Sequence, residues 1–100
     1  MNVLIIYNIN TTTALKKSIV EELKKIGYYD SWVYDSNEGK KKVFLPPNTL
    51  WKKDTEIKVP VQELKTILRS LSIPESSLLN CIAVPASPWN AIMGKQAEIA

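Results

Sequence analysis

Positive charge is concentrated in one stretch of the chain, residues 40–58. Six lysines and two acidic residues give this segment a larger net charge than the whole chain, which is +3. Lysine ammonium groups bind phosphates, and aromatic rings stack on nucleic-acid bases. Phe44 also lies in the segment. The pattern predicts that RNA or DNA binds here, through Lys40, Lys41, Lys42, Lys52, Lys53 and Trp51.

Two other interpretations of the basic segment stay open. Lysines on an edge strand keep it from pairing with other chains, so the same residues could serve solubility. A different anionic partner is the second alternative.

The residue types that most often perform catalysis are scarce in this chain. It has no histidine and a single cysteine, Cys81. Histidine is the commonest general base and metal ligand, and a nucleophilic cysteine needs such a base. Because Cys81 lies in the apolar run 78–84, we interpret it as a small buried hydrophobe. With no metal-ligand spacing and no glycine-rich phosphate loop, the sequence favours binding without catalysis and without a cofactor.

Four segments outside the basic stretch have clear strand or helix patterns, and these elements determine where the residues named above lie. Residues 3–9 form a continuous apolar run typical of a buried strand, as do residues 78–84. Apolar residues at helical spacing predict a helix over 13–26, with Gly27 as its C-terminal cap. A second helix starts with Pro60 and has Val61, Leu64, Leu68 and Leu71 on one face.

The middle of the chain, residues 28–53, is less regular. Strand candidates are 30–34, 42–45 and 49–53, and residues 35–39 have the composition of a turn. We expect 42–45 to pair with 49–53 as the central hairpin, after a short strand at 30–34. Which of these strands pair stays open, because a one-residue change of register would reverse every side chain.

The order strand, helix, strand, strand, helix, strand is typical of the ferredoxin-like βαββαβ sandwich. In this α+β fold, two helices lie on one face of a four-stranded antiparallel sheet. The other face would be open to solvent, a protein partner or a second copy of the chain. One hundred residues form a single domain, 1–100, with residues 86–100 as a C-terminal extension. We expect at least one of Trp32, Trp51 and Trp89 at a protein contact, or all three in the core.

No apolar run approaches the roughly 18 residues that a membrane-spanning helix needs. The sequence therefore predicts a soluble, cytoplasmic protein without a membrane partner.

Three short segments carry a resemblance to a known family: Ile6-Tyr7-Asn8-Ile9, Asn48-Thr49-Leu50-Trp51, and the run 78–84. Together with the helices between them, they resemble the small CRISPR-associated proteins that assist spacer integration, and their VapD-like relatives. The resemblance implies a ferredoxin-like fold and a homodimer joined through sheet edges or faces. It also implies kinship with members described as metal-dependent endoribonucleases.

In that family an aspartate ends the first strand and holds a divalent metal between two subunits. The matching residue here is Asn8, whose amide has no charge to neutralise a metal. A nuclease would need a degenerate site formed by Asn8 with Asp30 or Asp35, and magnesium would be its cofactor.

The leading hypothesis is a small dimeric, non-catalytic interaction protein that binds nucleic acid. The alternatives are an endoribonuclease-like protein with the degenerate site, and a regulatory module that binds a ligand or a protein on the open sheet face. The second of these rests on analogy with the fold alone. A toxin–antitoxin component is a further alternative, suggested by the VapD-like resemblance.

Overall fold

The computed structural model describes residues 1–86. Trp89 and nearly all of the expected extension, 86–100, lie outside the described residues. The elements, in chain order, are β1 (Val3–Ile9), α1 (Thr13–Lys25), β2 (Tyr28–Tyr29), β3 (Ser31–Ser36), β4 (Gly39–Phe44), β5 (Thr49–Lys52), α2 (Val59–Ser70), a short 3₁₀ helix (Glu75–Ser77) and β6 (Leu78–Pro85). The strands predicted at 3–9 and 78–84 and both predicted helices are confirmed to within about one residue. Pro60 is the second residue of α2, one position later than predicted.

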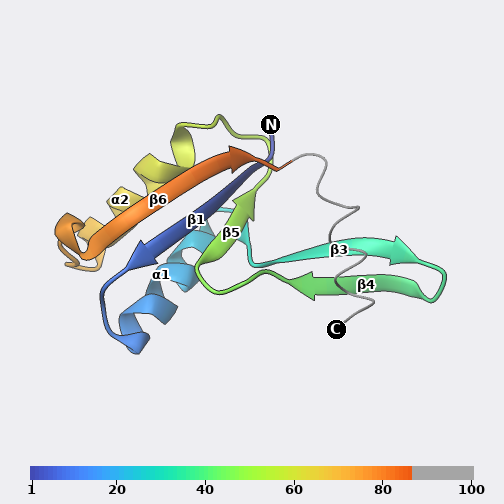
Figure 1. Ribbon diagram of the computed structural model, residues 1–100, viewed down its shortest axis with the longest axis horizontal. Coiled ribbons are helices and arrows are strands. Elements are labelled where there is room, and N and C mark those ends of the chain that lie inside the picture. Colours follow the sequence, from blue (N-terminus) through green and yellow to red (C-terminus); the bar gives the residue numbers. More distant parts are fainter. Residues whose placement is uncertain (87–100) are drawn as a thin grey trace.

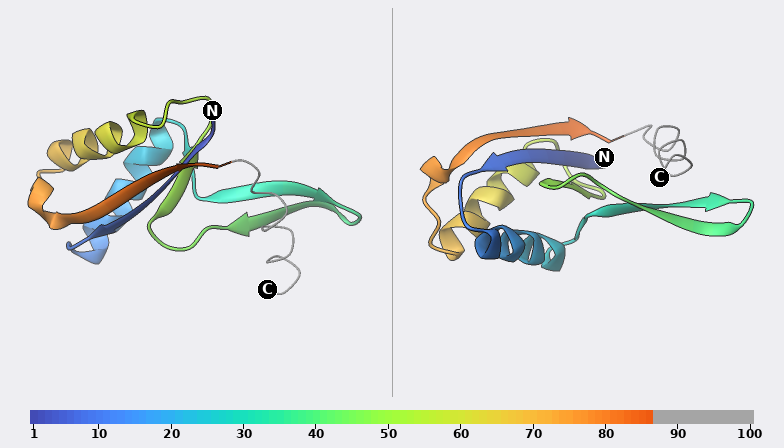
Figure 2. Two further views of the ribbon diagram at one scale, coloured as in Figure 1. Left: turned by 45° about the horizontal axis from the view of Figure 1, so that its top comes forward. Right: turned by 60° about the horizontal axis from the view of Figure 1, so that its bottom comes forward.

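Four strands form the main sheet, in the order β2-β5-β1-β6, and each neighbouring pair is antiparallel. Both helices cover the same face of this sheet, as the right-hand view of Figure 2 shows. The predicted α+β class, with two helices on an antiparallel sheet, is therefore confirmed.

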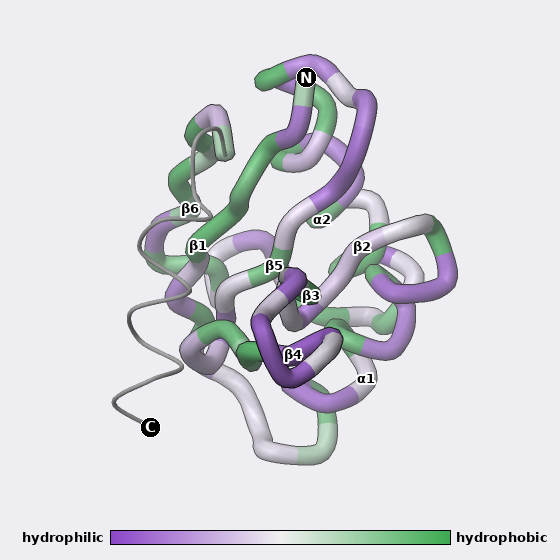
Figure 3. The backbone as a smooth tube through the Cα atoms, turned by 90° about the vertical axis from the view of Figure 1, so that its right-hand side faces the viewer, coloured by the Kyte–Doolittle hydropathy of each residue, from purple (hydrophilic) through white to green (hydrophobic). Residues whose placement is uncertain are grey.

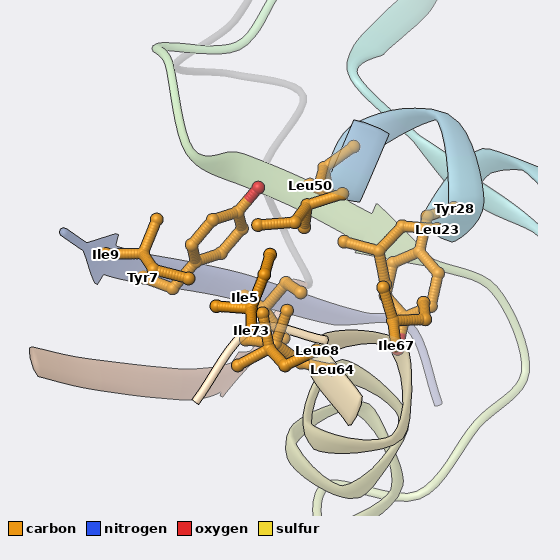
Figure 4. Packing of buried hydrophobic residues seen from close by; sticks show 11 residues of the cluster. Ile5, Tyr7, Ile9, Leu23, Tyr28, Leu50, Leu64, Ile67, Leu68 and Ile73 are labelled. Carbon is orange, nitrogen blue, oxygen red and sulfur yellow. The ribbon is translucent and has the colours of Figure 1, made fainter. Parts of the chain in front are cut away.

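Alternation along β1 explains how the helices attach to the sheet. Its odd-numbered residues are buried against the helices, whereas Ile6 and Asn8 are exposed on the opposite face. Figure 4 shows side chains from β1, β2, β5 and both helices meeting in this core. The buried members of the cluster are Ile5, Tyr7, Ile9, Ile19, Leu23, Tyr28, Leu50, Leu64, Ile67, Leu68 and Ile73.

The caps of α1 follow the local sequence. Thr12 Oγ1 accepts a hydrogen bond from the Leu15 amide at 3.2 Å, which satisfies one of the free donors of the first turn. Gly27 follows the helix with φ +102°, a left-handed conformation that glycine adopts without strain.

The expected pairing of 42–45 with 49–53 is wrong. Instead β3 pairs with β4 in a separate two-stranded sheet, the β3–β4 hairpin, which projects from one end of the molecule (Figure 1). Two features explain the difference. Gly39, with φ +101°, completes a tight turn between β3 and β4, and the Ser36 hydroxyl donates to its carbonyl at 2.8 Å. Pro46 and Pro47 have no amide hydrogens and end β4, so β5 pairs with β1 and β2.

The hairpin is anchored at its base. The Leu45 amide donates to the Asp30 carbonyl at 2.8 Å, and the indole nitrogen of Trp51 donates to the Ser31 carbonyl at 2.8 Å. Trp32 packs against Trp51 with ring centroids 5.9 Å apart. This second cluster also includes Ala86, Leu4, Val43 and Leu45. It covers part of the sheet face opposite the helices, so that face is less open than the sequence predicted.

Neither helix within residues 1–86 has the length and apolar character that crossing a membrane requires.

Candidate nucleic-acid interface

The lysines of β4 lie on two faces of the hairpin. Because side chains alternate along a strand, Lys40 and Lys42 share one face and Lys41 lies on the other. Lys41 Nζ pairs with Glu38 at 2.9 Å. Within residues 1–86, the structure records no ion pair for Lys40 or Lys42, and Asp35 is the Cα partner of Lys40 across the hairpin. Figure 3 looks toward the hairpin and shows the hydrophilic colour that follows β4.

The face that carries Lys40 and Lys42 also exposes apolar side chains. Val33 is the cross-strand partner of Lys42, and Phe44 lies two residues further along β4. Phe44 is 66% exposed, and Lys42 Nζ lies 5.0 Å from the centroid of its ring. This arrangement places the Lys42 ammonium beside an accessible aromatic ring.

Lys53 forms a second group with two rings on the sheet face opposite the helices. Its Nζ lies 5.3 Å from the Tyr29 ring and 5.8 Å from the Trp51 ring, which are stacked with centroids 4.9 Å apart. Trp51 is 6% exposed and Tyr29 is 43% exposed. A base can therefore reach Tyr29 but not Trp51, which the sequence analysis had assigned. Alternation along β5 puts Trp51 on the face opposite Leu50, where it packs against Trp32 of the hairpin.

Lys52 faces away from this surface. It points to the helix side of the sheet, where its Nζ lies 2.9 Å from a carboxylate oxygen of Glu63 in α2. The Tyr28 hydroxyl donates to the same carboxylate at 3.0 Å, and burial together with this hydrogen bond raises the pKa of Tyr28 well above its ordinary value. Lys58 lies 4.0 Å from Glu56. The basic segment of the sequence is thus divided among several surfaces.

The expected degenerate nuclease site joins Asn8 with Asp30 or Asp35, and the structure places these residues in different parts of the chain fold. Asn8 is exposed near the end of β1, opposite Asn80 of β6, whereas Asp35 belongs to the β3–β4 hairpin. The end of β1 and the tip of the hairpin lie at opposite ends of the molecule (Figure 1). Asp30 is paired with Lys24 at 2.7 Å, and this ion pair holds the pKa of its carboxyl below the ordinary value. Across residues 1–86, no three acidic or cysteine side chains come close enough together to hold a metal ion.

A pocket of about 220 Å³ lies between α1, the hairpin base and the β4–β5 connection. Pro46 and Pro47 form one wall, and Asn48 adopts a left-handed backbone conformation with φ 61°. The complete lining is Val20, Asp30, Phe44, Leu45, Pro46, Pro47, Asn48, Thr49 and Leu50. Phe44 therefore belongs both to this pocket and to the lysine face of the hairpin.

Cys81 lies on the helix side of β6, packed against the main core. Burial raises the pKa of its thiol, which disfavours the reactive thiolate. This environment agrees with the predicted role as a small hydrophobe.

No family model, curated protein or solved structure matches this chain.

Proposed function

We propose that this protein is a small dimeric, non-catalytic interaction protein that binds nucleic acid through the β3–β4 hairpin. One observation carries the proposal: Lys40 and Lys42 share a face of a projecting two-stranded ribbon, beside the exposed ring of Phe44. Alternate residues on a strand are about 7 Å apart, so the two ammonium groups can contact separate phosphates. A two-stranded ribbon is also narrow enough to enter the major groove of a duplex.

The ferredoxin-like architecture is part of this proposal. The strand order β2-β5-β1-β6, with both helices on one face, supports it. In this interpretation the β3–β4 hairpin is an extension between the second and third strands of the sandwich. It would give the chain a binding element that lies outside the packed core.

The positions of the acidic residues support a role without catalysis. The Asp30 carboxylate forms an ion pair with Lys24, and the Asn8 side chain is an uncharged amide. A divalent cation would have to displace Lys24 from Asp30, and Asn8 would offer it a neutral oxygen alone. Magnesium-dependent RNA cleavage that is lost in Asp30→Ala or Asp35→Ala would replace this proposal with the nuclease alternative.

The binding test is an anisotropy titration of labelled single-stranded RNA and duplex DNA at two salt concentrations. The informative variant is Lys40→Gln with Lys42→Gln, and its matched control is Lys17→Gln with Lys65→Gln on the two helices. Both variants remove two positive charges from exposed positions. We expect the hairpin variant to bind more weakly, with a slope of log K against log salt that is shallower by about 2, and the control to bind like the wild type.

Two results would contradict the proposal. Equal losses in both variants would mean that net charge alone attracts the nucleic acid. Absence of binding by the wild type at low salt would leave the lysines as protection of an edge strand, and the function would then depend on protein partners.

The pocket supports a second candidate function, a regulatory module that binds a small ligand. Its lining is mostly apolar, with Asp30, Asn48 and Thr49 as the polar residues, which is typical of small-molecule sites. A thermal-shift screen with a metabolite panel tests it. Stabilisation that Leu45→Trp abolishes would favour the pocket, and a screen without any stabilising compound would count against it.

A further inference from the structure

The outer edge of β6 is the longest strand edge of the main sheet that carries no partner in the described structure. β6 spans Leu78–Pro85 and is the last strand in the sheet order. It contains no charged residue, whereas β4 carries three lysines. Exposed edges normally carry charges or prolines that prevent pairing with another chain, and β6 has a proline at its end alone. Its central part is therefore suited to pair with a further strand.

The backbone hydrogen bonds show which groups of β6 point outward. The Ala86 amide donates to the Asn2 carbonyl of the neighbouring chain segment at 2.9 Å, and the Tyr7 amide donates to Asn48 on the β5 side at 3.1 Å. In an antiparallel ladder, residues alternate between facing one neighbour and the other. Even-numbered residues of β6 therefore bond β1, and the N–H and C=O groups of Cys81 and Ala83 point away from the sheet.

We propose that β6 pairs antiparallel with β6 of a second copy of this chain, about a two-fold axis at Ile82. Cys81 then lies opposite Ala83 of the second copy, and the two copies exchange four backbone hydrogen bonds. This inference deepens the dimeric state proposed above, and it makes no use of nucleic acid. The result is one continuous sheet with four strands from each chain.

The side chains on the face opposite the helices favour this register. Ile82 is 57% exposed, and its cross-strand neighbour Ile6 is 44% exposed. Pairing Ile82 with its own copy joins both residues of each chain into a continuous apolar row, which buries surface that each monomer exposes. The register also uses the regular part of β6, because the bulge near Asn8 and Ile9 lies at one end and Pro85 at the other.

The uncharged sequence of β6 points to a second copy as the occupant. An isologous interface brings the same residues face to face, so any charged residue near the axis would meet a like charge. The edge of β4 would place lysines opposite lysines, whereas residues 78–85 place none. A partner of different sequence would not require this neutrality.

The register can be tested by disulfide cross-linking. Ile82→Cys in a Cys81→Ser background places two thiols at a non-hydrogen-bonded pair, where the Cα atoms are about 4.5 Å apart and a disulfide can form. Val84→Cys in the same background is the matched control, since Val84 would lie opposite Asn80 of the second copy. We expect oxidation to give a covalent dimer with Ile82→Cys and a monomer with Val84→Cys on a non-reducing gel.

The surface is tested independently by light scattering after size exclusion. We expect the wild type at twice the 11.3 kDa mass of the chain, and Ile82→Lys at the monomer mass. Ile57→Lys is the control, because Ile57 is a similarly exposed isoleucine outside the sheets and should leave the dimer intact.

Each outcome decides a different part of the proposal. A dimer that tolerates Ile82→Lys and gives no Ile82 cross-link would overturn the β6 interface but leave the dimeric state. A wild-type monomer at about 100 μM would overturn both, because the dissociation constant would then lie above that concentration. Nucleic-acid binding is measured separately, so its failure would not affect either result.

Discussion

Lys52 Nζ lies 3.0 Å and 2.9 Å from the two carboxylate oxygens of Glu63, which joins β5 to α2. The side chains are 21% and 25% exposed, so the pair is partly shielded from water. Lys52 also lies over the Tyr28 ring, 5.2 Å from its centroid. A lysine of the basic segment thus contributes to the packing of a helix on the sheet.

Replacing Glu63 with Gln should lower the free energy of unfolding by about 1–2 kcal/mol. The substitution leaves the Lys52 ammonium without its carboxylate in a partly buried position. Urea denaturation followed by circular dichroism measures the change. A double-mutant cycle with Lys52→Met provides the control, and additivity of the two single changes would show that the ion pair does not couple β5 to α2.

Substitutions of Lys52 and Lys42 should have opposite effects: one should change the stability and the other the nucleic-acid affinity. Lys52→Gln should lower the stability and leave nucleic-acid affinity within about twofold of the wild type, because its side chain points to the helix side. Lys42→Gln should weaken binding and leave stability within about 0.5 kcal/mol. Anisotropy and urea titrations on the same samples measure both quantities. A binding loss with Lys52→Gln in the folded protein would contradict the assignment of the interface to the hairpin.

Tyr7→Phe should leave stability unchanged or raise it by up to about 1 kcal/mol. The Tyr7 hydroxyl is buried and has no hydrogen-bond partner among the described residues, so its removal relieves a desolvation cost. Burial also raises the pKa of Tyr7 from 10.0 to about 12. The unfolded chain therefore loses the Tyr7 proton at a lower pH than the folded protein does. The stability associated with the neutral Tyr7 side chain is fully present below pH 10 and is lost as pH rises toward 12.

Denaturant titrations between pH 8 and pH 12 follow this contribution. Tyr7→Phe should lose less stability than the wild type across the alkaline range. Tyr29→Phe is the control, because Tyr29 is exposed. Identical alkaline profiles for Tyr7→Phe and the wild type would show that the hydroxyl is solvated.

Asp30→Asn should lower stability at pH 7 by less than about 1 kcal/mol, because the Lys24 pair is substantially exposed. The pKa of Asp30 is lowered in the folded state, so its contribution is present above the unfolded pKa of about 3.8. It is lost as pH falls through the folded pKa. The difference between variant and wild type should disappear in acid, as thermal unfolding from pH 7 down to pH 2 would show. A difference that persists at pH 2 would mean that packing, and not charge, is responsible.

Gly39→Ala should destabilise the hairpin by about 1–2 kcal/mol, because φ +101° is strained for any residue with a Cβ. Apart from Gly39 and its two chain neighbours, no atom of residues 1–86 lies within 4 Å of the position a Cβ would take, so the cost comes from the backbone alone. Amide exchange at β3 and β4 should accelerate while β1 stays protected. Equal acceleration in both sheets would show that the hairpin and the main sheet open together.

The two helices and the strands β1 and β6 were predictable because their patterns are local. The four-residue spacing of Leu15, Ile19 and Leu23 defines a buried helix face without knowledge of its partner. The apolar run of β1 similarly indicates a central strand.

Strand pairing in the middle of the chain was not predictable from the same signals. The segment at 42–45 has two possible partner strands at similar distance along the chain, 30–34 and 49–53. It pairs with the first because Gly39 permits a tight turn between them, and because 49–53 pairs with β1 and β2 instead. The faces of the lysines depend on that pairing. Lys52 and Lys53 are adjacent in sequence but lie on opposite faces of the sheet, which composition alone cannot distinguish.

The hydrogen bond from Leu45 to Asp30 closes the base of the hairpin and has a consequence for protein engineering. Asp30 follows β2 directly and is hydrogen-bonded to Leu45, so the two ends of the inserted segment 31–44 lie next to each other. A short turn or a foreign ribbon could be grafted between Trp32 and Val43, which pack in the cluster around Trp51 and would stay in place, without lengthening the path from β2 to β5. The site can therefore accept exchangeable recognition elements of different length, on a scaffold whose helices and main sheet keep their connections.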